Sequence, residues 1–399
     1  MRTTRTLFAA LIAALTLTGT AFANEVISND SLADILVEKG VITKEEATKA
    51  GKSKDGKLQL EALFFLNTYH QQADTTTAAG TTNVKTTGLA VDRAYFTGKY
   101  FFNDDWMMRI TLDAGNDANT AKRQNVFLKA AYVEGKLVGK AAVLRLGQSH
   151  TPWIDYEQGL WKHRYVAQVM SDRYSFDDSF DLGVGLKGEL ANGLLQYFVT
   201  ETNGTGYSTA NRSGSVDLNT RIGIYPIDGL TLDFQFRDGH RGTKTSGTAP
   251  TAGVKSQLIQ SMVSYGTNDF RLGGNYIDNK DKAKSATQSI LHDGFVTSAL
   301  RTAAVGDELK STAFAVWGWV KFPGTDFGAF GRFENIKHKL NTNATEEKLN
   351  RYMGGLEYTA LKGVDFSLVV DNTKLKNRGG VAADQRKDIR YGLFSQVKF

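Results

Sequence analysis

Residues 387–399, KDIRYGLFSQVKF, are the stretch of this sequence that decides the fold. Alternate residues fall into two sets: Val397, Ser395, Leu393, Tyr391 and Ile389, and Lys398, Gln396, Phe394, Gly392 and Arg390. A period of two is typical of a β-strand. The last residue is aromatic, and such a terminal strand is typical of β-barrels of the bacterial outer membrane. We therefore expect an insertion signal made by Tyr391, Leu393, Val397 and Phe399.

The opening segment 1–23 has the features of a secretory signal peptide. Arg2 and Arg5 precede an apolar run from Leu7 to Leu17, and small residues follow that run. The run is shorter than the roughly 20 apolar residues that a membrane-spanning helix needs. We therefore expect residues 1–23 to be removed and the mature chain to be exported.

Composition supports a barrel rather than a globular fold. The chain has 40 Gly, 23 Phe and 15 Tyr but only 4 Pro and no Cys. The lack of cysteine excludes disulfides, thiol catalysis and thiolate metal sites. Formal net charge is +6, and about +4 remains once the two arginines of the signal peptide are removed. This mild charge comes without a basic block or recognition motif, which argues against nucleic-acid binding.

Sequence that predicts helices is confined to the region just after the signal peptide. In residues 24–56, Asp30 or Ser31 caps a first helix that Gly40 ends, and Thr43 with Glu46 forms a capping box for a second. We interpret 24–56 as a periplasmic helical hairpin and linker that plugs or flanks a barrel mouth. A separate role in binding a partner stays open.

The remaining segment, 57–399, predicts an all-β fold, a 16-stranded antiparallel transmembrane β-barrel. Connections alternate between short turns and long polar segments, such as 70–88, 149–179, 279–308 and 375–386. Short periplasmic turns on one rim and long extracellular loops on the other are typical of outer-membrane barrels. All four prolines fall in connections, as expected because proline cannot donate to a strand ladder. The predicted strands are 58–69, 89–102, 106–115, 125–136, 141–148, 180–190, 193–203, 215–225, 230–239, 254–266, 269–278, 309–322, 326–337, 348–359, 364–374 and 387–399.

The polar face of each predicted strand carries charges of both signs, which a dry core would not tolerate unpaired. We therefore assign this face to a wet lumen. A basic excess there predicts a mild preference for anions, although many of these cations could instead pair with acids on neighbouring strands. The predicted pore-lining cations are Arg93, Lys99, Arg109, Lys129, Arg145, Lys187, Arg221, Arg237, Arg271, Arg332, Arg351 and Arg390.

The connection 149–179 is richer in aromatic residues than a solvated loop requires. A sixteen-stranded barrel has a lumen wide enough for water, so we predict that this segment folds inward as a constriction. The alternative is a cap packed outside the lumen. The residues that we assign to the constriction are Trp153, Asp155, Glu157, Lys162, Arg164 and Arg173.

No motif for catalysis, cofactor or metal binding is present in the sequence. All six histidines lie in or beside predicted extracellular loops, and none forms an HExxH pair. No GxSxG or P-loop sequence occurs either. We therefore expect no enzyme activity, no metal and no cofactor.

Two segments resemble the phosphate-selective porin O and P family of Gram-negative bacteria. They are VDRAYFTGKYFFNDDWMMRITLDAG (91–115) and FLKAAYVEGKLVGKAAVLRLGQSHTPW (127–153), and the GVITKEEA text near the N-terminus also recurs in such porins. The resemblance implies a sixteen-stranded barrel, a homotrimer, and luminal arginines and a third loop that guide small solutes. By position, it makes Arg93, Lys129 and Arg145 wall residues.

These observations together predict an outer-membrane porin, a water-filled channel for passive diffusion of small hydrophilic solutes. We expect a mild anion preference, with phosphate the anion that the resemblance implies. Its partners would be small inorganic ions, hydrophilic solutes, and the lipid and lipopolysaccharide of the outer membrane. The alternative is an outer-membrane barrel with an occluded pore that binds a ligand or acts as an adhesin.

Overall fold

A computed structural model of the chain describes residues 56–116, 124–207, 216–241, 254–283, 288–289, 302–303 and 306–399, together with Thr43. Residues Lys57–Phe399 form one compact unit. The predicted signal peptide and the predicted helical hairpin lie outside the described residues, apart from Thr43 and Gly56. Within the described part of the chain, no helix is both long enough and apolar enough to cross a membrane.

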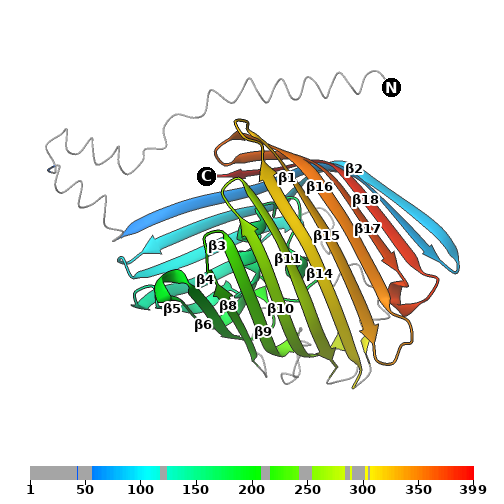
Figure 1. The fold of residues 1–399 in the computed structure, drawn as a ribbon, viewed down its shortest axis with the longest axis horizontal. Helices are drawn as coiled ribbons and strands as arrows, with labels where there is room; N and C mark the ends of the chain where they lie inside the picture. The colour runs from blue at the N-terminus through cyan, green and yellow to red at the C-terminus, as the bar shows by residue number, and fades with distance from the viewer. Residues whose placement is uncertain are drawn as a thin grey trace. The chain divides into compact units, whose positions relative to one another are not determined.

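Sixteen strands of this unit close into one antiparallel barrel (Figure 1), which confirms the predicted all-β fold. Each barrel strand pairs with the next along the chain, and the ring closes where β1 pairs with β18, with Leu63 opposite Lys398. The barrel strands are β1 (Lys57–Thr77), β2 (Gly80–Phe101), β3 (Trp106–Asn116), β4 (Gln124–Val138), β5 (Ala142–His150), β6 (Phe180–Leu190), β7 (Leu195–Thr202), β8 (Asp217–Ile224), β9 (Leu230–Arg241), β10 (Val254–Gly266), β11 (Phe270–Lys282), β14 (Glu308–Lys321), β15 (Phe327–Leu340), β16 (Glu347–Leu361), β17 (Val364–Lys376) and β18 (Gln385–Lys398).

A few short elements lie in the connections between barrel strands. Two helices, α4 (Ile154–Trp161) and α5 (Met170–Arg173), follow β5, and the 3₁₀ turns η1 (Ala191–Gly193) and η3 (Arg378–Gly380) lie on opposite rims. A two-residue pair, β12 (Gln288–Ser289) with β13 (Thr302–Ala303), forms a sheet of its own.

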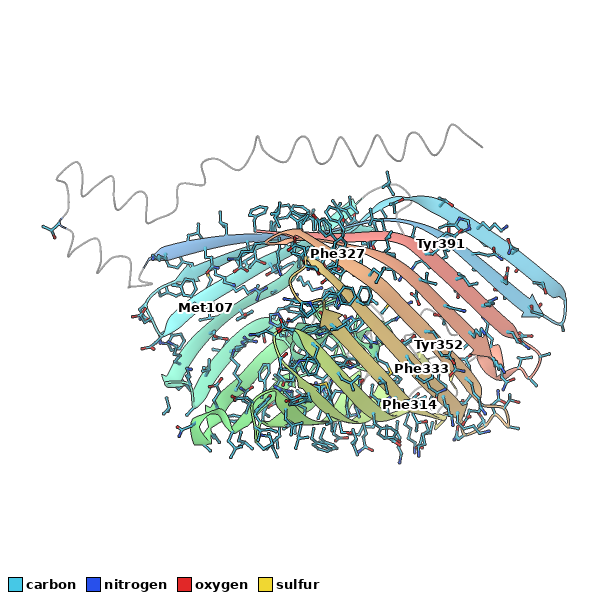
Figure 2. The ribbon with its side chains drawn as sticks, turned by 45° about the horizontal axis from the view of Figure 1, so that its top comes forward. Met107, Phe314, Phe327, Phe333, Tyr352 and Tyr391 are labelled. Atoms are coloured by element: carbon cyan, nitrogen blue, oxygen red, sulfur yellow. The ribbon has the colours of Figure 1, made fainter. Side chains whose placement is uncertain are left out.

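The two faces of each strand differ in chemistry, as β8 illustrates. Its buried side chains include Asp217, Asn219 and Arg221, whereas Leu218 and Ile222 are exposed. Apolar residues face outward all round the barrel. They include an aromatic row across β14, β15 and β16 made by the exposed Phe314 and Tyr352 and the half-buried Phe333 between them (Figure 2). An apolar outer face and a polar inner face fit a barrel surrounded by hydrocarbon.

The rim that carries the short turns is as predicted. Connections there span two to five residues, and one of them, between β8 and β9, ends on Gly229 with a φ of +81°. A Cβ at this glycine would lie 2.2 Å from the carbonyl oxygen of Gly266. Both observations explain why glycine closes this turn.

The predicted long connection 70–88 is wrong. β1 and β2 continue as a ribbon until Thr77 opposes Gly80, so the connection is a tight turn of two residues. The segment is rich in threonine, which has a high β-propensity although it is polar, and Thr76 hydrogen-bonds Thr81 across the ribbon. Polarity alone therefore misled the prediction at this rim.

Candidate functional site

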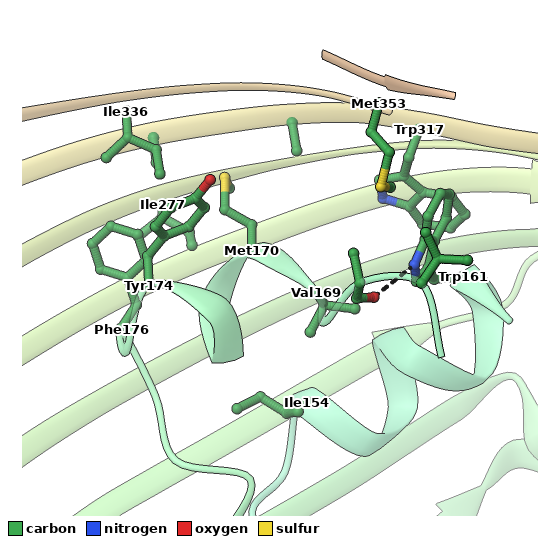
Figure 3. Close-up of a cluster of buried hydrophobic side chains, with 14 of the residues drawn as sticks. Ile154, Trp161, Val169, Met170, Tyr174, Phe176, Ile277, Trp317, Ile336 and Met353 are labelled. Carbon is green, nitrogen blue, oxygen red and sulfur yellow. Dashed lines mark hydrogen bonds between the residues drawn. The ribbon is translucent and has the colours of Figure 1, made fainter. Parts of the chain in front are cut away.

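The connection after β5 runs inside the barrel. Residues 151–179, here called the inward loop, contain α4 and α5 and bury five aromatic side chains to 2% exposure or less: Trp153, Trp161, Tyr165, Tyr174 and Phe176. These side chains pack with residues from the inner faces of β10, β11, β14, β15 and β16 (Figure 3), namely Leu258, Ile277, Trp317, Ile336 and Met353. The inward loop therefore lies in the lumen, against one side of the wall.

The apolar inner wall was missed by sequence reasoning, which assigned polar residues alone to the lumen. A usable signal exists in β14, where AFAVWGWV is apolar on both faces and so breaks the alternation. Opposite Trp317, β11 carries Gly273, where a Cβ would lie 2.5 Å from the indole. The small residue leaves room for the indole between wall and loop.

Hydrogen bonds fix the inward loop to the wall at several points. Tyr165 donates to Glu357 at 2.7 Å, and Tyr174 donates to Glu334 at 2.8 Å. Wall side chains also donate to loop carbonyls: Trp319 to Leu160 at 2.9 Å, Arg237 to Phe176 at 2.7 Å, and Arg332 to Gln168 at 3.2 Å. Because these contacts reach from β9 to β16, the loop is held across a broad part of the wall.

Beneath the loop, the wall charges form a buried network. The Glu334 carboxylate lies 2.6 Å from Arg332 and 3.3 Å from Arg351. Arg351 also pairs with Asp371 at 2.8 Å, and Asp371 with Arg390 at 3.0 Å. Buried charges are tolerated when they are paired and hydrogen-bonded in this way, so these cations serve the packing of wall and loop.

On the other side of the inward loop, a cavity of about 700 Å³ separates it from β1–β4. Two of the predicted pore-lining cations, Arg109 and Lys129, line this cavity, and so do two of the predicted constriction residues, Asp155 and Arg164. The Asp155 side chain is 66% exposed and lies 3.5 Å from His150. This cavity is an open space between the inward loop and that side of the wall.

The remaining predicted cations are mostly engaged with acids of the same face. Arg93 pairs with Asp113 at 2.9 Å, Lys99 with Glu61 at 2.5 Å, and Arg221 with Asp233 at 2.6 Å. Arg145 and Lys187 share Glu134, at 2.6 Å and 2.9 Å. Arg271 instead donates to the hydroxyl of Ser264 at 2.9 Å.

The other predicted loop residues have distinct surroundings. Trp153 donates to Glu157 at 2.7 Å, and burial raises the pKa of the Glu157 carboxyl to about 7, although Arg332 and the Trp153 hydrogen bond oppose that shift. The Lys162 amine lies 4.0 Å from the centre of a Trp319 ring, and Arg173 ends α5.

The predicted insertion residues lie on the last strand and at its end. Tyr391 and Phe399 are 50% and 77% exposed, whereas Leu393 and Val397 are half-buried. The backbone of Phe399 exchanges two hydrogen bonds of 3.1 Å with Ala62 of β1, so the terminal residue takes part in barrel closure.

The histidines do not follow the sequence-based expectation that all lie in or beside loops. His70 lies within β1 and is 2.6 Å from the Thr87 hydroxyl, and His338 lies within β15 and is 2.7 Å from Ser311. His163 of the inward loop pairs with Glu357 at 3.0 Å, and His292 lies outside the described residues. Among the residues described, no three His, Asp or Glu side chains are grouped so as to hold a metal ion.

A closed sixteen-stranded ring with an apolar outside, a charged inside and an inward loop defines a porin-type barrel. No family model matches the sequence, and no curated protein matches it. Among solved structures, the anion-selective porin of Comamonas acidovorans is similar with a TM-score of 0.58 at 13% identity, over 87% of this chain and 100% of that one.

Two further structures share the fold at similar identity. The outer-membrane channel DcaP of Acinetobacter baumannii has a TM-score of 0.57 at 13% identity, over 86% of this chain and 98% of that one. A loop-deletion mutant of OmpT, an outer-membrane protein of Vibrio cholerae, has a TM-score of 0.56 at 12% identity, over 86% of this chain and 99% of that one. At such identities the likeness is one of fold.

Proposed function

We propose that this protein is an outer-membrane porin, a water-filled channel through which small hydrophilic solutes diffuse passively. The observation that carries the proposal is the cavity of about 700 Å³ beside the inward loop, inside a barrel whose outer face is apolar. The similar solved structures support it, since they include an anion-selective porin and an outer-membrane channel. We extend the proposal to bacterial outer-membrane localisation, to a signal peptide at 1–23, and to the absence of enzyme activity.

A mild anion preference is the selectivity that the cavity supports. Its lining includes five basic side chains and three acidic ones, a difference of +2, and the terminal carboxylate of Phe399 reduces this to +1 if it faces the cavity. The basic residues are Arg109, Lys129, Arg164, Lys362 and Lys398, and the acidic ones are Glu61, Asp155 and Asp172. Charges in a narrow aqueous path set the local concentration of counter-ions. Phosphate selectivity, which the family resemblance implies, is the narrower form of this proposal.

Reversal potentials in planar bilayers under a salt gradient test the proposal. We expect modest anion selectivity, and substituting Arg93, Arg109 and Arg145 by Glu should move it toward cations, because three basic side chains of the inner face become acidic, and Asp113 and Glu134 each lose one of their two cations. Substituting the exposed, outward-facing Lys376 by Glu is the matched control. Strong cation selectivity in the unaltered protein, or no conductance, contradicts the proposal.

A homotrimer is the assembly that we propose, as the family resemblance implies. One similar structure is of the trimer form of OmpT, an outer-membrane protein of Vibrio cholerae. Cross-linking in native membranes measures this directly, and a monomer alone would contradict it.

The extensive packing of the inward loop against the wall favours a second candidate, an occluded barrel that binds a surface ligand or acts as an adhesin. Swelling of liposomes in sugar solutions separates the two candidates. A porin makes the vesicles swell, and an occluded barrel does not.

A further inference from the structure

The open cavity has an apolar side made largely by aromatic residues. Phe65 and Tyr95, on neighbouring strands, meet edge to face with ring centres 6.0 Å apart, and Phe180, Leu63 and Ile154 also line the cavity. A path for fully hydrated inorganic ions needs no such surface. Pockets that hold small organic molecules, in contrast, combine an apolar lining with a few placed polar groups, in volumes of about 300–1,000 Å³.

Two guanidinium groups face the same cavity from different elements. Arg109 comes from β3, and Arg164 comes from the inward loop, where its guanidinium carbon lies 5.8 Å from the centre of the Phe65 ring. Among the described residues no carboxylate pairs with Arg109, whose Nε donates to the neutral Thr111 hydroxyl at 3.1 Å. Arg164 has an acidic neighbour at 3.9 Å, Asp172, which is too distant for a hydrogen bond.

Two of the acidic side chains that line the cavity are, in contrast, already engaged. Glu61 pairs with Lys99 at 2.5 Å. Asp172 accepts hydrogen bonds from Gln158 at 3.0 Å and Gln168 at 2.9 Å. Neither carboxylate is therefore held by Arg109 or Arg164 in a hydrogen-bonded ion pair, and the third acidic side chain, Asp155, has His150 as its neighbour at 3.5 Å.

We propose that this cavity is a binding site for small aromatic carboxylates, in which Arg109 and Arg164 attract the carboxylate and the ring packs on the half-buried Tyr95 and Leu63. The inference rests on the proposed porin function and names its substrate class. Guanidinium groups match carboxylates in geometry and form strong, charge-assisted hydrogen bonds. The Tyr95 ring in the same lining adds a contact that acetate and inorganic phosphate cannot make.

Benzoate is the probe for this site, added to single channels in planar bilayers bathed in KCl. Benzoate should interrupt the current at about tenfold lower concentration than acetate, phosphate or benzyl alcohol, because each comparator lacks either the ring or the carboxylate. Arg109→Gln should weaken the benzoate effect about tenfold, which corresponds to about 1.4 kcal/mol. Arg164→Gln should weaken it in the same direction, while Lys376→Gln, which removes a charge from the outer face, should leave it unchanged.

The outcomes separate the binding site from the channel itself. If no channel conducts KCl, the proposed function fails, and this inference fails with it. If channels conduct but benzoate acts no more strongly than acetate and phosphate, the aromatic site is overturned while the porin function stands. An unchanged benzoate effect in both Arg109→Gln and Arg164→Gln, in channels of normal conductance, overturns it equally.

Discussion

Truncating Trp161 to alanine should release the inward loop from the wall. The indole is fully buried, donates to the Ala167 carbonyl at 3.1 Å, and meets Trp317 and Phe330 edge to face at 6.0 Å and 5.9 Å. A buried indole covers about 200 Å², worth about 5 kcal/mol at about 25 cal/mol per Å². Measured losses for such truncations are about 3–5 kcal/mol. A loss of about 4 kcal/mol lowers the ratio of docked to undocked loop roughly a thousandfold.

Two measurements report the release of the loop. Single-channel conductance should rise and become noisier, because the undocked loop no longer fills its side of the lumen. Trypsin should cut faster after Lys162 and Arg164, because the backbone there becomes mobile once the loop is released. Trp106→Ala is the control, since Trp106 begins β3, away from the inward loop, and is 37% exposed. Unchanged conductance together with unchanged resistance to trypsin in a folded Trp161→Ala barrel would refute the reasoning.

Four further predictions concern other parts of the barrel. Burial raises the pKa of Glu157 to about 7 from a usual 4.5, so the docked loop should become more stable as the pH falls from 7 to 4.5, and channels should be quieter at pH 5 than at pH 8. Glu157→Gln should abolish this pH dependence, and a pH dependence that persists in the variant would exclude Glu157 as its origin. Glu334→Gln should cost about 3–5 kcal/mol in urea unfolding in detergent, since it leaves the buried Arg332 guanidinium without its carboxylate and removes one of the two carboxylates of Arg351. A loss under about 1 kcal/mol would contradict this. Phe399→Ala should impair assembly in cells but still refold in detergent, because the backbone hydrogen bonds to Ala62 remain. Deleting Phe399 should impair both assembly and refolding, and equal refolding of the two variants in detergent would contradict this. An epitope inserted after Ala79 should leave conductance unchanged and should be labelled on intact cells, because the turn there is exposed. A loss of conductance would contradict the position of this turn at an exposed rim.

The strands could be predicted because a membrane barrel imposes a strict chemical alternation. In β8, Leu218 and Ile222 must face hydrocarbon while Asn219 and Arg221 face the interior, so the period of two is plain in the text. The alternation marks residues that face lipid, and it says nothing about where a strand ends beyond the membrane. For this reason, the sequence predicts a long connection at 70–88, although this segment is a paired ribbon except at its two-residue turn.

The inward loop could be located from its aromatic residues, but its contacts could not. Tyr174 meets Glu334, 160 residues away in the sequence, and Tyr165 meets Glu357, 192 residues away. Those pairings depend on the curvature of the closed wall and on the path of the loop, neither of which leaves a periodic trace in the sequence. The same is true of Arg351, whose two acidic partners lie on β15 and β17.

The apolar wall and the inward loop together divide the luminal cations into two classes. Arg237 and Arg351 lie beneath the loop, with side chains at most 1% exposed, so in the proposed channel they are out of reach of a passing solute and act on stability. Arg109 and Arg164 line the open cavity, so there a passing anion meets them directly. Substitutions in the first class should therefore shift the unfolding midpoint and leave the reversal potential alone, while those in the second should do the opposite. A count of luminal charges that ignores this division would overestimate the anion preference, because most of the cations that it includes are already neutralised.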